Sequence, residues 1–278
     1  MALFNRSASV ILQTENEQTE IKNVRIVFDC TKSSDSTKNG ATIQVYNLSQ
    51  KTRAKFDVKD AKIILNAGYV DSGGEEILFS GTITQSTHKL ELPEIITYFE
   101  VSDGFKALRD ARISESLKSG TTLKQVIKLL TDATGLPIKE LSDKIPDEQF
   151  SQGVSLIGSV YDQIVSIADK YGLEFSVINE EIQVVKKHDV NNDTAIVLHS
   201  GTGLIKKPER IIKDSSKLTY SDVKKLKVES LLIPQLNPAG TVEIISDEVN
   251  GLFRIDSVQH TGDTHGQNWT SVCEVRAI

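Results

Sequence analysis

The sequence predicts a mainly β (α+β) protein in which a small α/β insert separates two β-barrel-like domains. Apolar and polar residues alternate with a period of two in the first and last thirds of the 278-residue chain, which is typical of half-buried strands. In the middle third the spacing changes to i, i+3, i+4, i+7, which indicates amphipathic helices. The chain is 38% hydrophobic and 25% charged, as folded globular proteins are, and we expect domains at 1–108, 109–190 and 191–278.

The first domain, residues 1–108, is expected to be built from short strands. In the segment GATIQVYNLS, Ile43 and Val45 face one side, while Thr42 and Gln44 face the other. The segments IKNVRIVFDC, AKIILNAGY, EEILFSGTITQS and IITYFEVSD alternate in a similar way. The segment VDSGGEE between two of them has the composition of a hairpin loop. Several short strands at regular spacing favour a barrel or a sandwich.

The insert, residues 109–190, is predicted to contain two helices and a hairpin. The first helix has an N-cap at Thr121 or Thr122 and Gly135 at its C-terminal end. The second lies in SVYDQIVSIADKYG and ends at Gly172, and the following LEFSVINEEIQVVKK alternates like a hairpin. The apolar face of the first helix consists of Leu123, Val126, Ile127 and Leu130.

The last domain, residues 191–278, returns to strands. Apolar residues alternate with charged ones in DVKKLKVESLLIP, and the turn PQLNPAG ends that strand. The segments TVEIIS, LFRIDSVQH and NWTSVCEVR are predicted to be three further strands. In the second of these we expect Phe253 and Ile255 to face inward, with Arg254 and Asp256 facing solvent.

Charge and cysteine content argue against several classes of protein. The formal net charge of −6 does not suit a protein that coats DNA, which needs a basic surface to displace counterions. Cys30 and Cys273 form no CxxC pair, so we expect two buried free thiols rather than a zinc ribbon or a disulfide framework. The N-terminus does not resemble a signal peptide, and no stretch approaches about 20 apolar residues. We therefore expect folding in a cytoplasm, without membrane insertion.

The motifs of common enzyme classes do not occur in the sequence, which has no G-x-S-x-G, H-E-x-x-H or G-x-x-x-x-G-K-[ST]. Residues 201–206, GTGLIK, begin like a dinucleotide loop but have Lys206 at the position of the third glycine. Asp189, Asn191 and Asp193 match the first three ligands of an EF-hand. The glycine of its sharp turn and its bidentate glutamate are both replaced, so we interpret these residues as part of a polar linker.

The most site-like cluster is HTGDTHGQNWT, near the C-terminus. His260, Asp263 and His265 have the chemistry to bind a metal or to share a proton. Gly262 and Gly266 frame them as a hairpin loop, in which Asp and Thr usually hydrogen-bond their own backbone. We interpret the loop as a structural turn, with a metal or catalytic site and a partner-contact loop as alternatives. We assign no catalytic, cofactor-binding or metal-binding residue and no cofactor.

Charged pairs elsewhere are interpreted as solvated side chains. Two carboxylate pairs fall in predicted hairpin turns, and two short basic runs lack the interleaved aromatics of a nucleic-acid platform. The carboxylates are Glu75–Glu76 and Glu180–Glu181, and the basic runs are Lys186–Lys187–His188 and Lys206–Lys207.

Two long stretches resemble a known family. The first is IQVYNLSQKTRAKF with the later ILNAGYVDSGGEEILFSGTITQS, and the second runs from LLIPQLNPAG to the final VCEVRAI. The second contains P-x-L-x-P, N-G-x-F-R-I, H-x-G-D and a tryptophan in that order. Together they resemble the baseplate hub proteins of phage tails, the group that includes the late-control protein D type of contractile-tailed phages and related injection machines. The likeness covers most of the chain, which is short for that group.

The resemblance implies a structural subunit and not an enzyme. Hubs of this family are homotrimers whose subunits each bring two similar β-barrel domains, so that three subunits give a pseudo-sixfold ring. The ring implied by the resemblance joins the tail tube protein to a trimeric spike protein and contacts other baseplate proteins, while DNA only passes through its lumen. The implied location is the virion, in the tail baseplate, with assembly in the host bacterial cytoplasm. We hypothesise that the negative net charge helps to line a channel to which DNA does not stick.

Three other functions stay open from the sequence. A distal adaptor of a long tail would have related barrels. A tail-associated cell-wall hydrolase would need the Asp263–His265 loop as its site. A carbohydrate-binding module would need exposed aromatics, which an aromatic content of 6% with one tryptophan does not favour.

Overall fold

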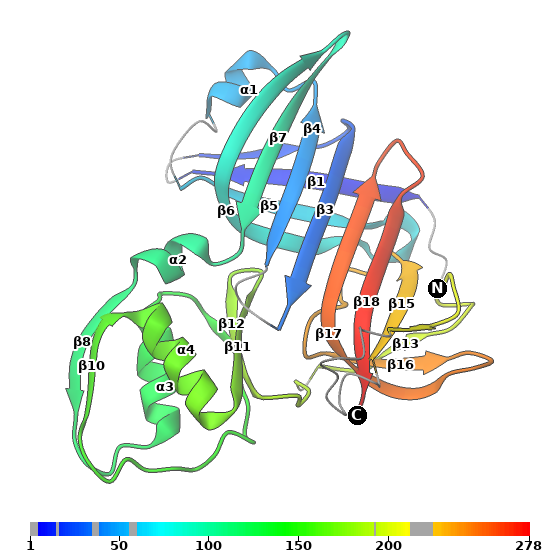
Figure 1. Ribbon diagram of the computed structural model, residues 1–278. Helices are drawn as coiled ribbons and strands as arrows, with labels where there is room; N and C mark the ends of the chain where they lie inside the picture. Colours follow the sequence, from blue (N-terminus) through cyan, green and yellow to red (C-terminus); the bar gives the residue numbers. More distant parts are fainter. Residues whose placement is uncertain (1–4, 15–16, 35–38, 56–59, 192, 212–224) are drawn as a thin grey trace.

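The computed structural model describes residues 5–14, 17–34, 39–55, 60–191, 193–211 and 225–278. Strands account for 53% of it and helices for 15%, which confirms the predicted mainly β class. Most strands form one large sheet, and an α/β unit lies beside it (Figure 1). Within the described ranges, no helix is long and apolar enough to cross a membrane.

The N-terminal region supplies seven strands of the large sheet, in the order β3-β4-β7-β6-β5-β1-β2, with all neighbours antiparallel. A short helix, α1 (Gln50–Lys55), follows β4, and a single 3-10 turn, η2 (Val70–Ser72), joins β5 to β6 within the predicted hairpin loop. The strands are β1 (Arg6–Gln13), β2 (Gln18–Ile21), β3 (Ile26–Ser33), β4 (Gly40–Tyr46), β5 (Lys62–Tyr69), β6 (Gly74–Glu91) and β7 (Glu94–Ser102).

The C-terminal region supplies the other strands of this sheet. β17 is central to it, because it pairs with β16, with β18 and with β3. The four strands predicted after residue 224 are all present, as β15 to β18. The strands are β13 (Ile196–Leu198), β14 (Glu209–Arg210), β15 (Lys225–Leu231), β16 (Thr241–Ile245), β17 (Asn250–Asp263) and β18 (Trp269–Ala277).

The predicted β class holds, but the two expected barrels do not, because β17 and β3 join both regions into one sheet. Their ladder runs from Ser257 opposite Ser33 to Asp263 opposite Val27. A bulge after Ile255 divides β17, so its first part pairs with β16 and its second part with β3. Bulges bend a strand and redirect its pairing. The sheet in the described part of the chain is therefore continuous and is not closed into a barrel.

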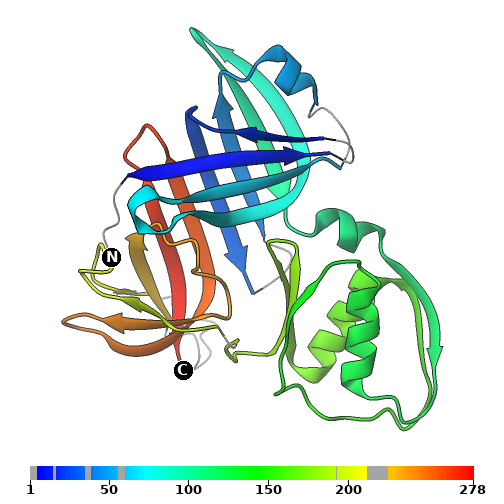
Figure 2. The same cartoon turned by 180° about the vertical axis from the view of Figure 1, so that it is seen from behind.

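The insert lies between the two β regions in sequence and beside the sheet in space (Figures 1 and 2). Both predicted helices are present. Thr122 caps the first with a capping box shared with Gln125, and Gly172 ends the second in the left-handed conformation, at φ 61°. The elements are α2 (Phe105–Asp110), β8 (Arg112–Leu117), α3 (Leu123–Asp132), β9 (Ile138–Leu141), β10 (Val154–Ser159), α4 (Val160–Tyr171), β11 (Leu173–Ile178) and β12 (Glu181–Lys186).

Three apolar cores stabilise the fold: one under the N-terminal strands, one inside the insert and one under the C-terminal strands. Leu232 and Trp269 come from the C-terminal region but belong to the first core, so the two β regions share packing as well as backbone pairing. The expected domain limits at residues 109 and 191 stay a prediction.

Candidate functional site

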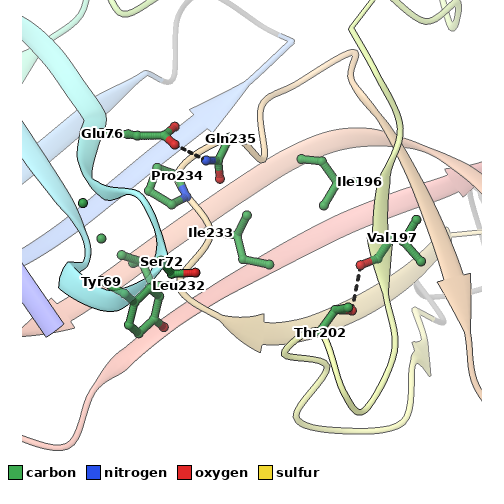
Figure 3. Close-up of a pocket in the computed structure, with 12 residues that line it drawn as sticks. Tyr69, Ser72, Glu76, Ile196, Val197, Thr202, Leu232, Ile233, Pro234 and Gln235 are labelled. Carbon is green, nitrogen blue, oxygen red and sulfur yellow. Dashed lines mark hydrogen bonds between the residues drawn. The ribbon is translucent and has the colours of Figure 1, made fainter. Parts of the chain in front are cut away.

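A pocket of about 380 Å³ lies between the turn that joins β5 to β6 and two segments of the C-terminal region (Figure 3). The β5–β6 turn forms one wall, the segment after β15 forms a second, and β13 with the loop that follows it forms a third. The labelled lining residues are Tyr69, Ser72 and Glu76, then Leu232, Ile233, Pro234 and Gln235, then Ile196, Val197 and Thr202.

The lining of this pocket is mostly apolar. Glu76 accepts a hydrogen bond from Gln235, and the Thr202 hydroxyl donates to the carbonyl of Val197 at 2.7 Å (Figure 3). Burial raises the pKa of Tyr69 to about 12, so its hydroxyl stays neutral. Such a lining offers no acid–base pair and suits an apolar group with few polar contacts.

The predicted C-terminal hairpin is present, but the structure does not bring His260, Asp263 and His265 together as a site. His260 is fully buried with its Nδ1 2.8 Å from Ser271 Oγ, and burial lowers its pKa to about 3. Asp263 is paired with Arg25, and its Oδ1 accepts from the backbone N–H of His265 at 2.9 Å. The loop forms a turn between β17 and β18, in which Asp263 is engaged by Arg25 and His260 is buried away from it. Within the described ranges, no group of three His, Cys, Asp or Glu side chains could hold a metal.

The ladder between β17 and β3 is reinforced by aromatic packing, and we call this contact the aromatic join. Trp269 is fully buried and meets Phe28 edge-on, with ring centroids 5.5 Å apart, and Tyr69 at 6.5 Å. Gly262 is needed here for close approach, because a Cβ would lie 2.2 Å from the Phe28 ring. At its end, Arg25 Nη2 lies 2.8 Å from an Asp263 oxygen and lowers the pKa of that carboxyl.

A buried ionic cluster, which we call the ionic join, holds the insert against β17. Arg254 is 1% exposed. Its Nε donates to the carbonyl of Asp189 at 2.6 Å, its Nη1 donates to Asp256 at 2.6 Å, and its Nη2 pairs with Glu174 on β11. Burial favours a raised pKa for Asp256, but hydrogen bonding to Arg276 and the surrounding cations lower the pKa overall. Each of the three guanidinium nitrogens of Arg254 therefore has an acceptor inside the protein.

The prediction that Arg254 and Asp256 face solvent is wrong. Phe253 and Ile255 are buried as expected, but Arg254 and Asp256 on the opposite face are buried too. The insert covers that face through Glu174. Alternation along one strand shows that its two faces differ in polarity, and it cannot show that a charged partner from elsewhere covers the polar face.

Two further buried charged side chains, Lys32 and Asp103, lie on the large sheet near the insert. Lys32 is fully buried and donates to Asn237 Oδ1 at 2.9 Å. Asp103 is 3% exposed and accepts from the backbone N–H groups of Asn179 and Glu180 at 2.6 and 2.8 Å. Burial raises the pKa of Asp103 and lowers the pKa of Lys32, and the charge of each opposes the shift of the other. The β11–β12 turn is thereby fixed to the start of the insert.

These two buried charges were missed from the sequence, although a signal for them exists. Lys32 lies two residues after Cys30 and four after Phe28, so it falls on the same buried face of its strand. Asp103 follows the buried Phe99 and Val101 at the same spacing. A charged residue in register with a buried stripe marks a buried charge that needs a partner.

The interpretation of the carboxylate pairs as solvated turn charges is only partly correct. Glu75 lies in β6 and accepts hydrogen bonds from the hydroxyls of Ser7 and Ser9. Glu180 pairs with Lys62 at 2.7 Å and so ties the insert to β5. Their partners are far away in sequence, which local patterning cannot show.

The predicted polar linker after the insert is also held by specific contacts. Asp189 pairs with Lys144 at 2.7 Å, and Asp193 pairs with Lys139 at 2.8 Å. The Asn191 side chain donates to Asp193 at 2.8 Å. Two of the three EF-hand-like residues are therefore neutralised by lysines.

The second basic run is paired with carboxylates, and one residue of the first lies beside a carboxylate. Lys206 lies 2.7 Å from Glu229 and Lys207 lies 2.8 Å from Glu248, while His188 lies against the ionic join. These pairs are at the surface and compensate the local positive charge.

The cysteines are two buried free thiols, as predicted. Burial raises the pKa of Cys273 to about 12 and also raises the pKa of Cys30, so both stay protonated at neutral pH.

No protein-family model and no curated protein matches the sequence. Solved structures match over almost the whole chain. The 43 kDa tail protein of prophage MuSo2 from Shewanella oneidensis is 11% identical with a TM-score of 0.65, and the match covers 98% of this chain and 97% of that one. A tail protein from Neisseria meningitidis MC58 is 10% identical with a TM-score of 0.64 and the same two coverages.

A third match is an E. coli component of the type VI secretion system, itself structurally similar to the T4 bacteriophage tail proteins gp27 and gp5. It is 12% identical with a TM-score of 0.62, and the match covers 96% of this chain and 76% of that one. The chain therefore has the fold of phage tail proteins, which confirms, at the level of fold, the resemblance carried by its motifs.

Proposed function

We propose that the chain is a structural subunit of a phage tail baseplate hub, in which three copies form a pseudo-sixfold ring between the tail tube and a trimeric spike. One observation carries the proposal: the fold match extends over 98% of this chain and 97% of the MuSo2 tail protein. The match thus includes the insert and both β regions, and not a single common module. Contacts with other baseplate proteins, DNA passage through the lumen and a place in the virion belong to the same proposal.

Exposed apolar side chains support an assembling role. Val197, Ile245 and Leu252 are exposed and lie on one face of the β13-β16-β17 part of the sheet, where Val197 is opposite Glu243 and Glu243 is opposite Leu252. Single exposed apolar residues are ordinary, but grouped ones mark contact surfaces.

The mass of the native assembly tests this proposal. We expect a species of three times the mass of one chain, seen by native mass spectrometry over a range of concentrations, and a ring-shaped particle by electron microscopy. A monomer under every condition contradicts the ring. A ring with a basic lumen contradicts the separate idea that negative charge keeps DNA from sticking.

A further inference from the structure

The β6–β7 hairpin carries an exposed apolar tip. β5 pairs with β6 only as far as Thr82, and the rest of β6 pairs with β7 alone. The hairpin therefore projects beyond the sheet, as the top of Figure 1 shows. Leu90 and Leu92, at its end, are 67% and 84% exposed. Two leucines held in water on a projecting arm leave apolar surface that association would bury.

The apolar pocket of Figure 3 offers a place for such side chains. Its volume of about 380 Å³ is more than twice the roughly 150 Å³ of a cavity that binds benzene. Val197 and the segment Leu232–Pro234 give it apolar walls, and Val70, in the turn beside it, is exposed as well. Two branched apolar side chains fit such a space.

The tip cannot reach the pocket of its own chain. Gly74 and Glu76, at the start of β6, line the pocket, whereas the tip begins at Glu91, the end of the same strand. At about 3.3 Å per residue, roughly 55 Å of backbone along this curved strand of 18 residues lie between the two features (Figure 1). The occupant of the pocket must come from another molecule.

One pair of opposite charges accompanies the two features. Lys89 precedes Leu90 at the tip, and Glu76 lies in the pocket lining. The tip also carries Glu91 and Glu94, so the orientation that suits the pocket places Lys89, and not these carboxylates, beside Glu76. A Lys89–Glu76 pair at the rim would favour this one orientation of the tip.

We propose that the β6–β7 tip of one subunit inserts Leu90 and Leu92 into the pocket of the neighbouring copy of this chain. The contact is head-to-tail, and contacts of this type generate closed rings when the rotation closes. The inference rests on the proposed ring and names the surfaces that hold it together. It also explains why one chain carries both an unpartnered apolar tip and an unpartnered apolar pocket.

Matched surface variants test the docking contact. Leu92→Asp replaces an apolar side chain of the tip with a charge, and Val197→Asp places a charge in the pocket lining. Ile157→Asp, at an exposed position on β10, is the control. We expect the first two variants to associate at least about tenfold more weakly than the wild type, and the control to assemble normally. Thermal unfolding of each variant checks that the monomer is folded.

Mixing the two defective variants gives the sharper result. A head-to-tail contact predicts a dimer in the mixture, because one intact tip and one intact pocket remain, while each variant alone stays monomeric. If the wild type is a trimer and both variants still form trimers, the docking contact is wrong and the ring stands. If variants and mixture are all monomeric, the head-to-tail arrangement is wrong. A wild type that is always monomeric overturns both the ring and the contact.

Discussion

Two buried contacts on β17 hold the regions of the chain together, and one is mainly apolar while the other is ionic. At the aromatic join, β17 adds to β3 through a backbone ladder, and Trp269 packs on Phe28 and Tyr69. At the ionic join, Arg254 on the same strand holds the insert through Glu174. Both joins are buried, and the bulge after Ile255 separates them along β17.

The difference lies in what each contact contributes. Apolar burial is non-directional and stabilises in proportion to the area removed from water. A buried ion pair gains little net free energy over an apolar contact of the same shape, but losing one partner is costly. We therefore expect the aromatic join to supply most of the stability and the ionic join to fix the orientation of the insert.

Trp269→Ala is expected to have the largest effect on stability. The side chain is fully buried and contacts two aromatic rings, so its truncation should lower the free energy of unfolding by about 3–5 kcal/mol. Urea unfolding followed by circular dichroism measures the loss. Phe150→Ala, at a partly buried ring packed on the core of the insert, is the control and should cost less. A loss below about 1 kcal/mol would show that the aromatic join is not the main source of stability.

Arg254→Met is expected to have the next largest effect and to lower the free energy of unfolding by about 3 kcal/mol. The substitution leaves Glu174 without its buried partner, whereas Asp256 is still paired with Arg276. A double-mutant cycle with Glu174→Gln separates the pair from the rest. We expect Glu174→Gln to be much less damaging when Arg254 is already Met. Strictly additive losses would mean that the two charges do not act as a pair.

Many local features of the fold could be predicted from the sequence. The apolar face of α3, its Thr122 cap and the Gly172 terminus of α4 depend on residues within one or two turns. The strands of both β regions are likewise marked by their own alternation. Each of these signals is contained in a single segment, which is why it could be recognised.

The joins and the pocket could not be predicted in the same way, because they depend on segments far apart in sequence. The bulge that sends β17 to β3 leaves no mark in the alternation of LFRIDSVQH, so two barrels were expected instead of one sheet. The pocket is formed by three segments that are unremarkable when considered singly. Lys32 is the exception, because its every-second-residue spacing from Phe28 and Cys30 marks it as a buried charge.

His260 is a titratable group within the aromatic join, so the pH dependence of stability reports whether that contact excludes water. It lies opposite Cys30 on β3 and is fully buried, and burial lowers its pKa to about 3, against about 6.5 in an unfolded chain. Between these values the unfolded state binds more protons, so the stability that the neutral ring contributes is present above pH 6.5 and is lost as the pH falls toward 3.

His260→Gln removes this titration, and the Gln side chain can still hydrogen-bond Ser271. Between pH 6.5 and pH 5 the wild type should lose about 1.6 kcal/mol more unfolding free energy than the variant, because the slope approaches 1.36 kcal/mol for each pH unit only below pH 6.5. Urea unfolding at the two pH values gives both differences. His265→Gln, at an exposed position in the adjacent loop, is the control and should follow the wild type. Equal pH dependence of His260→Gln and the wild type would mean that water reaches His260, and the aromatic join would then be less closed than the ionic join.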